Sequence, residues 1–236
     1  RGNAQYSGIE PLRGPVNAGA TSFRKELVVA EAGHLDALIH FAGRAYRRPL
    51  TDREVGDLRS LYQQLREQRL PHEQAFRLTL ARVFVASPFL FRLEKAPSGS
   101  DAAPVSDWEL ASRLSYFLWS SQPDAQLRKL AATGELHTPT ILVNQARRML
   151  QDARVRRLAS EFACQWLDIY GFAENAEKSS ERFPDFGRLR SAMHEESLRF
   201  FGDMFRSDRS ILDILDADHA FLNGPLAKHY GIEAVS

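Results

Sequence analysis

Hydrophobic residues recur at three- and four-residue intervals along most of this chain, which is the pattern of amphipathic helices. The strongest such segment is 108–119, where apolar and small side chains, Phe117 among them, cover an arc of about 220°. Only Glu109, Arg113 and Tyr116 occupy the rest of the circumference. Because a surface helix needs an apolar stripe of only about 100°, we expect this helix to be enclosed by protein on most sides and to be the central packing element of a helical domain.

Residues that start and stop helices divide the rest of the chain into further segments. Thr51 and Glu54 have the spacing of a capping box, and Pro123 stands where a proline opens a helix. The pattern predicts helices over about 34–48, 51–70, 72–86, 106–119, 123–133, 138–150, 152–170, 186–206, 210–215 and 223–230. No segment alternates in the manner of a β-strand, so the sequence predicts an all-α fold: a multi-helix, bundle-like domain preceded by a small helical unit.

Composition along the chain sets the predicted domain boundaries. Residues 1–33 are rich in glycine and also hold Pro11 and Pro15, which predicts an irregular N-terminal arm. A small helical domain over 34–93 follows, and the Pro-, Ser- and Gly-containing stretch 94–102 is the clearest linker. The larger all-helical domain is expected over 103–236.

The predicted helix over 152–170 carries the only cysteine of the chain. Val155, Phe162 and Trp166 share one face of an ideal helix and are expected to be buried, whereas Cys164 falls about 180° away. Cys164 is then either exposed or part of a second interface. A catalytic thiol would need a base beside it, and no histidine is near in sequence, so a small packing residue is the favoured interpretation.

Charge and composition exclude few function classes. The 236 residues carry 31 basic and 30 acidic side chains, a net charge of +1, which provides no general field for nucleic acid or an anionic membrane. A single cysteine excludes an intramolecular disulfide and a CxxC metal or haem motif. No apolar run approaches the ~18 residues of a membrane span, and no signal peptide is visible. Because the chain begins at Arg1, we expect a fragment or a processed product.

Several long motifs resemble the tandem uncharacterised domains of planctomycete cytochrome c-associated proteins. The first domain is represented by FAGRAYRRPLT (41–51) and VFVASPFLFRLE (83–94), and the second by VSDWELASRLSYFLWSSQPD (105–124), FACQWL (162–167), ILDILDADHAFLN (211–223) and LAKHYGI (226–232). The resemblance covers about 35–232. Cys164 stands where that family usually has glycine, and His219 where it usually has tyrosine.

The resemblance implies a context but no reaction. Members of that family are typically exported, so a periplasmic or otherwise extracytoplasmic location is expected. Many carry covalent haem c elsewhere in the parent protein, whereas this fragment lacks the haem motif and no cofactor is expected in it. The family offers no catalytic residues to transfer.

Two groups of charged residues are the weak catalytic candidates. Glu196 falls within an apolar stripe of the predicted long helix, and a buried carboxylate needs a specific partner, of which Arg113 is one possibility. It is either a general acid or base or a metal ligand, or it is one half of a structural ion pair, which is the favoured interpretation. Glu109 and Arg113 are four residues apart, which favours a helix-supporting pair over the wall of a cleft with Tyr116.

A dense acidic cluster supplies the other weak metal candidates. Asp216, Asp218 and His219, with Asp213 close by, could offer oxygen and imidazole ligands. The spacing matches no EF-hand, and aspartates that cap helices and form turns explain the cluster more simply. No metal is therefore assigned.

Two groups of arginines are expected on solvated faces. They comprise Arg147, Arg148, Arg154, Arg156 and Arg157 in one group, and Arg44, Arg47 and Arg48 in the other. A protein contact is the second interpretation, and nucleic-acid binding is disfavoured by the neighbouring acidic residues.

The leading functional hypothesis is a non-catalytic scaffold or protein-interaction module of a larger exported, haem-c-associated bacterial protein. Its partners would be other domains of the parent protein or separate proteins, with no nucleic acid and no membrane span. The alternative is an enzyme domain, either a hydrolase or an oxidoreductase accessory, built on Glu196 with Glu109 and Arg113 or on the aspartate cluster.

Overall fold

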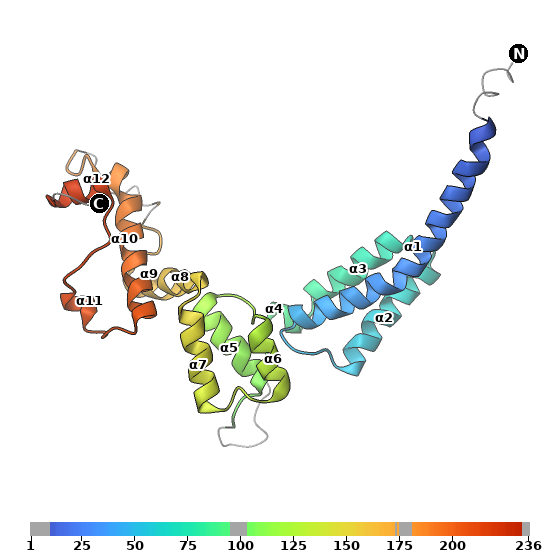
Figure 1. Ribbon diagram of the computed structural model, residues 1–236, viewed down its shortest axis with the longest axis horizontal. Coiled ribbons are helices and arrows are strands. Elements are labelled where there is room, and N and C mark those ends of the chain that lie inside the picture. Colours follow the sequence, from blue (N-terminus) through green and yellow to red (C-terminus); the bar gives the residue numbers. More distant parts are fainter. Residues whose placement is uncertain (1–9, 95–102, 173, 175–180, 233–236) are drawn as a thin grey trace, which may run out of the picture. The chain divides into compact units, whose positions relative to one another are not determined.

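The computed structural model describes residues 10–94, 103–172, 174 and 181–232 (Figure 1). Every regular element in these ranges is a helix and none is a strand, which confirms the all-α prediction. The chain divides into two units, unit 1 over Arg1–Leu93 and unit 2 over Glu94–Ser236. None of the helices in the described ranges is long and apolar enough to cross a membrane. The predicted linker lies outside the described residues from residue 95 onward.

Unit 1 is a small helical bundle. Its elements are α1 (Glu10–Ala45), α2 (Asp52–Glu67), α3 (His72–Phe84) and the single turn α4 (Ser87–Leu90). The helices α2 and α3 pack on each other and on α1. The core that they share consists of Leu38, Ala42, Tyr46, Leu58, Val83 and Ala86. All the core residues from α1 come from its C-terminal part, and Figure 1 shows the N-terminal part of α1 extending beyond α2 and α3.

The helix α1 corrects the predicted irregular arm over 1–33. Residues 10–33 are helical and continue without a break into the packed part of α1, and residues 1–9 lie outside the described part of the chain. Glycine inside a helix costs about 1 kcal/mol relative to alanine, as at Gly14, Gly19 and Gly33. Extending an existing helix, however, avoids the unfavourable nucleation step. Continuity with a packed helix therefore outweighs the glycine-rich composition.

The Thr51 capping box predicted at the start of α2 is present. The Thr51 hydroxyl accepts a hydrogen bond from the Glu54 amide, and the Glu54 carboxylate accepts one from the Thr51 amide at 2.8 Å. The Arg48 guanidinium adds two hydrogen bonds to the same carboxylate, both at 2.8 Å. These contacts, with Arg48 the largest cause, lower the pKa of Glu54 to about 2 from an ordinary value of 4.5.

Stability at low pH depends on this carboxylate. Because the pKa of Glu54 is lower in the folded chain than in the unfolded chain, its contribution is complete above about pH 5 and is lost as the pH falls toward 2. We expect Glu54→Gln to lower the stability of unit 1 by about 1 kcal/mol at pH 7, the typical value of a cap, and by less at pH 3. Calorimetry of the full chain between pH 3 and 7 measures this. Asp52→Asn is the matched control, and an equal effect of both variants at every pH would contradict the assignment.

Arg47 lies where α1 ends, and the predicted solvated face is wrong for this residue. Its side chain is only 8% exposed, and its backbone is left-handed, with φ of 61°. The guanidinium donates hydrogen bonds to the carbonyl oxygens of Ala45, Pro88, Phe89 and Phe91. Because Ala45 ends α1 and the other three carbonyls lie in α4 or just after it, Arg47 connects the end of α1 to α4.

Unit 2 contains the longer series of helices. Its first part consists of α5 (Asp107–Trp119), α6 (Ala125–Thr133) and α7 (Pro139–Leu150). A segmented helical stretch over 153–166 follows, and the unit is completed by α10 (Phe186–Ser207), α11 (Asp213–Asp216) and α12 (Gly224–Tyr230). Pro123 does not open α6, because Asp124 is its N-cap and accepts a hydrogen bond from the Leu127 amide.

The helix α5 is the centre of the first part of unit 2, with one correction. It packs against α6, α7 and the start of the segmented stretch, and it buries Ala111, Ser115, Leu118 and Trp119. Trp108 is partly buried against the same core. Phe117, however, is 64% exposed, so the enclosed arc is narrower than predicted. Phe117 lay at the edge of that arc, beside Arg113 on the helical wheel, where a sequence pattern does not settle burial.

Trp119 makes several polar contacts at the edge of the core around α5. It is fully buried, and its indole N–H donates to the Met149 carbonyl oxygen at 2.9 Å. The Arg154 guanidinium carbon lies 3.4 Å from the centre of the ring, a cation–π contact. Arg154 is held there by two hydrogen bonds to the Asp152 carboxylate. One aromatic side chain therefore connects α5 to the end of α7 and to the turn that follows.

Candidate functional site

The stretch 153–166 is not the single regular helix that the sequence predicts. It consists of a 3₁₀ turn (Ala153–Val155), the α-helical turn α8 (Arg156–Leu158), a π-helix (Ala159–Ala163) and the turn α9 (Cys164–Trp166). The helix ends at Leu167, because Asp168 has a left-handed backbone with φ of 56°. A π-helical turn holds an extra residue, so it rotates every later side chain relative to an ideal α-helix.

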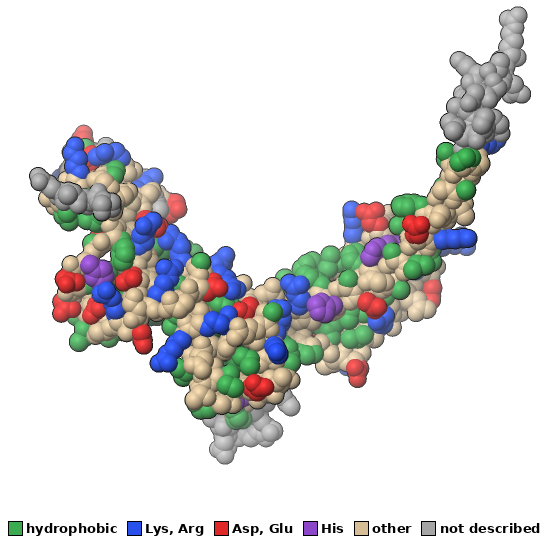
Figure 2. Space-filling view, viewed as in Figure 1, with side chains coloured by type: hydrophobic (Ala, Val, Ile, Leu, Met, Phe, Trp, Pro, Cys, Tyr) green, Lys and Arg blue, Asp and Glu red, His purple; other side chains and the backbone are tan. Residues whose placement is uncertain are grey.

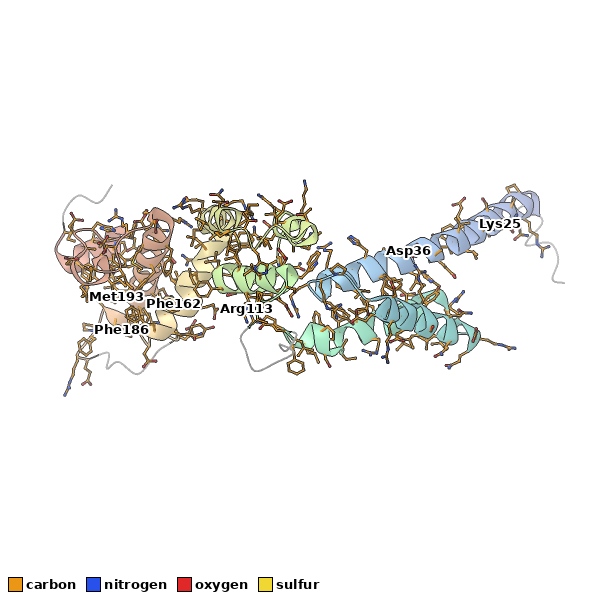
Figure 3. All side chains as sticks on the ribbon, turned by 90° about the horizontal axis from the view of Figure 1, so that it is seen from below. Lys25, Asp36, Arg113, Phe162, Phe186 and Met193 are labelled. Carbon is orange, nitrogen blue, oxygen red and sulfur yellow. The ribbon has the colours of Figure 1, made fainter. Side chains whose placement is uncertain are left out.

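That rotation exposes aromatic residues which the sequence predicts to be buried. Phe162 and Trp166 are 52% and 59% exposed, so the predicted buried stripe is wrong beyond Ala159. Leu167 (42% exposed) and Tyr170 (55% exposed) follow within four residues of Trp166, and we call these four exposed side chains the aromatic patch. Figure 3 labels Phe162 on this segment. Polar Glu161, Gln165 and Asp168 are interspersed with the patch along the chain and are exposed too.

The opposite face of the π-helix is firmly packed. Ala159, Ala163 and Cys164 are buried against α10, where Leu198, Phe201 and Met204 complete a separate hydrophobic core. An ion pair adds to this contact, since Arg156 donates two hydrogen bonds to Glu195 and Arg199 donates one to the same carboxylate at 2.9 Å. The packing against α10 therefore holds in place the backbone segment that carries the aromatic patch.

Cys164 is a packing residue, as favoured from the sequence. Its side chain is 1% exposed, and burial raises the pKa of the thiol above its ordinary value. The fold brings His194 of α10 to within 3.7 Å of the sulfur, a neighbour that lies 30 residues away in sequence. A buried thiol with a raised pKa contains little thiolate at neutral pH, which is the opposite of what a nucleophile needs.

The catalytic candidates have separate structural partners. Glu196 is only partly buried and accepts a hydrogen bond from the Tyr230 hydroxyl at 3.0 Å, so the predicted core position and the suggested Arg113 partner are wrong. Arg113 instead donates two hydrogen bonds, each of 2.6 Å, to Glu94. Glu109 accepts hydrogen bonds from the Ser106 amide and hydroxyl, which form a capping box for α5.

The fold brings together part of the predicted acidic cluster. His219 Nδ1 lies 3.5 Å from Asp218, and its Nε2 lies 3.9 Å from Asp203 of α10, while Asp216 ends α11. Arg209 forms ion pairs with Asp203 and Asp213. Within the described ranges, no three or more His, Cys, Asp or Glu side chains are arranged to hold a metal ion. Ion pairing around the end of α10 accounts for these contacts.

The predicted basic face of unit 2 is largely neutralised. Arg148 forms an ion pair with Asp124 at 2.8 Å, Arg154 pairs with Asp152 at 2.8 Å, and Arg156 pairs with Glu195. Because Arg148 and Arg154 also lie over the Trp119 ring, the solvated-face interpretation is wrong for these two. They support the core of unit 2.

Unit 1 contains a polar network that the sequence analysis missed. His34 Nδ1 of α1 lies 3.0 Å from His72 Nε2 of α3, and His72 Nδ1 lies 2.7 Å from the Tyr62 hydroxyl of α2. Tyr62 also reaches the Glu31 carboxylate at 3.5 Å, and Arg66 holds that carboxylate with two hydrogen bonds of 3.2 Å. His34 and His72 are 38 residues apart, so no local pattern could have paired them.

Comparison with known families finds a match to an uncharacterised family in each unit. Residues 105–232 match the family described as "PSD4: Protein of unknown function (DUF1592)", and residues 35–94 match "PSD5: Protein of unknown function (DUF1595)". These matches confirm that two uncharacterised domains occur in tandem. Neither a curated protein nor a solved structure matches the chain. The aromatic patch and Trp119 both lie within the PSD4 match.

Proposed function

The chain belongs to the PSD4 family, and we propose that it is a non-catalytic helical module that binds a protein partner through the aromatic patch. The observation that supports this proposal is the exposure of Phe162, Trp166 and Tyr170 on a rigidly packed segment. Trp and Tyr are enriched at protein interfaces, and large exposed apolar patches mark interaction sites.

The composition of the patch suits a protein surface. Phe162 and Trp166 are one helical turn apart, and aromatic side chains contribute large contact areas with little conformational entropy to lose. Exposed Glu161, Gln165 and Asp168 would supply the polar rim that surrounds the apolar centre of most interfaces. The packed alanines on the opposite face hold the backbone in the binding conformation, which reduces the entropic cost of association.

The proposed partner is another domain of a larger exported bacterial protein that carries haem c outside this fragment. The motifs of both tandem domains support that context through their resemblance to planctomycete cytochrome c-associated proteins. In this proposal the chain functions in the periplasm or another extracytoplasmic space, and it carries no haem itself. Glu109 caps α5, Arg113 pairs with Glu94 and Glu196 bonds Tyr230, and these separate contacts give the enzyme alternative no support.

The test is the binding of variants to the haem-bearing part of the parent protein. We expect Trp166→Ala to weaken binding about 30-fold, the effect of an interface residue worth about 2 kcal/mol. The same variant should change the free energy of unfolding by no more than about 0.5 kcal/mol, because the side chain is mostly exposed. Isothermal titration calorimetry and urea denaturation measure the two effects.

Phe117→Ala is the matched control for the binding experiment. Phe117 is also an exposed aromatic residue on a helix of unit 2, but it lies outside the aromatic patch. We expect this variant to bind as tightly as the native chain. Equal binding by the Trp166→Ala, Phe162→Ala and native chains would exclude the aromatic patch as the contact surface.

A further inference from the structure

The histidine pair of unit 1 has the geometry of two ligands of a single metal ion. We propose that His34 and His72 bind one divalent transition-metal ion through Nδ1 of His34 and Nε2 of His72. Two nitrogen ligands at about 2.0–2.1 Å from an ion, with an angle of roughly 90–109° between them, lie about 2.9–3.4 Å apart. The observed separation of 3.0 Å lies within that range. The ion would therefore need little rearrangement of α1 and α3.

The other ring nitrogen of His72, Nδ1, has a hydrogen-bond partner, as is usual for a histidine that binds a metal. A metal-binding imidazole commonly donates its other N–H to a fixed acceptor, which sets the tautomer and strengthens the ligand. His72 Nδ1 faces the Tyr62 hydroxyl at 2.7 Å, Tyr62 faces Glu31, and Arg66 holds Glu31. When His72 Nδ1–H donates to Tyr62 and Tyr62 donates to Glu31, the lone pair of His72 Nε2 points to the ion.

The number of protons on the two imidazole rings is also compatible with metal binding. Each neutral imidazole carries one N–H, and in the metal-free pair the His34 Nδ1–H can donate to His72 Nε2. Metal binding then requires only that the His34 proton move to its Nε2, with no net loss of a proton from two neutral rings.

The ligand set indicates the class of ion. Imidazole nitrogens suit Cu²⁺, Ni²⁺ and Zn²⁺, and of these Cu²⁺ binds most tightly to a given nitrogen site. Among the described residues the proposed site has two protein ligands, His34 and His72, and water would complete the coordination of the ion. Solvent can reach the pair, since His34 is exposed and His72 is half-buried, and Figure 2 shows histidine side chains at the surface of unit 1.

The experiment uses the full chain after removal of metals with EDTA and dialysis. Titration with Cu²⁺, and separately with Zn²⁺, is followed by calorimetry at pH 7.5. We expect one site whose affinity falls at least about tenfold in His34→Ala and in His72→Ala. Tyr62→Phe keeps both imidazoles but removes the hydroxyl, and we expect about a tenfold loss, the low end for a group that supports a ligand. The electron paramagnetic resonance spectrum of the Cu²⁺ form should show two coupled imidazole nitrogens, and one in His34→Ala.

His40→Ala is the matched control, because His40 is an exposed histidine on the same helix. It should leave the affinity and the spectrum unchanged. His34 is an exposed side chain that hydrogen-bonds His72, so His34→Ala is expected to fold and keeps the test valid even if His72→Ala fails to fold. An unchanged affinity in His34→Ala, or the absence of a two-nitrogen Cu²⁺ spectrum from the native chain, would overturn the proposal.

Discussion

Replacing Trp119 with alanine is expected to lower the free energy of unfolding of unit 2 by about 3–5 kcal/mol, the range for a buried tryptophan. The indole is fully buried and bonds the Met149 carbonyl, and Arg154 stacks on it. Its loss leaves a cavity and a displaced guanidinium, and the Met149 carbonyl keeps its hydrogen bond from the Asp152 amide. All three tryptophans lie in unit 2, so tryptophan fluorescence during urea denaturation reports on that unit alone.

Two further variants separate the contributions of Trp119. Trp119→Phe keeps most of the apolar volume and removes the hydrogen bond to Met149, so a smaller loss of about 1–2 kcal/mol is expected. Phe117→Ala truncates an aromatic residue on the same helix that is 64% exposed, and it should change stability by no more than about 0.5 kcal/mol. Equal losses from Trp119→Ala and Phe117→Ala would show that α5 is not the centre of this core.

The sequence was most informative where a single residue type determines a local contact. The capping box at Thr51 was readable because its contacts lie within three residues of one another. The all-α class followed from periodicity over most of the chain. Gly134 ends α6 with φ of 72°, a left-handed conformation that glycine adopts without strain.

The aromatic patch could not be predicted, because one extra residue changes which face is buried. An ideal helix through 152–170 places Phe162 and Trp166 with Val155, on the buried side. The π-helix over Ala159–Ala163 turns these aromatic residues outward and Cys164 inward. A π-helical turn has no strong composition signal, so its position emerges only from packing against α10.

Contacts between residues far apart in sequence could not be predicted either. Three contacts join residues that are at least 30 positions apart in sequence: His34 with His72, Cys164 with His194, and Glu196 with Tyr230. Periodicity assigns a residue to one face of its helix, but it does not show which other helix packs against that face. The candidate carboxylates were therefore found as polar residues on helices, while their partners were not.

The same difficulty applies to Arg47, whose replacement is expected to have the largest effect in unit 1. Arg47→Ala removes a charged donor from four carbonyl oxygens, and we expect a loss of about 3 kcal/mol, since hydrogen bonds to charged groups contribute about 1.5–3 kcal/mol. Unit 1 has no tryptophan, so hydrogen exchange of peptides from 35–90 in the full chain is the measurement. The protection of backbone amides from exchange should fall first in the peptides that form the α1–α4 contact.

A second arginine in the same backbone conformation provides the control for Arg47. Arg69 follows α2 with φ of 66°, yet its side chain is exposed. Arg69→Ala should therefore change stability by no more than about 0.5 kcal/mol. Replacing Arg47 with glycine instead of alanine should recover about 1 kcal/mol, because glycine adopts the left-handed conformation without strain. If Arg47→Ala were as stable as Arg69→Ala, the carbonyl contacts would contribute nothing, and the end of α1 would be held by Tyr46 and the rest of the hydrophobic core alone.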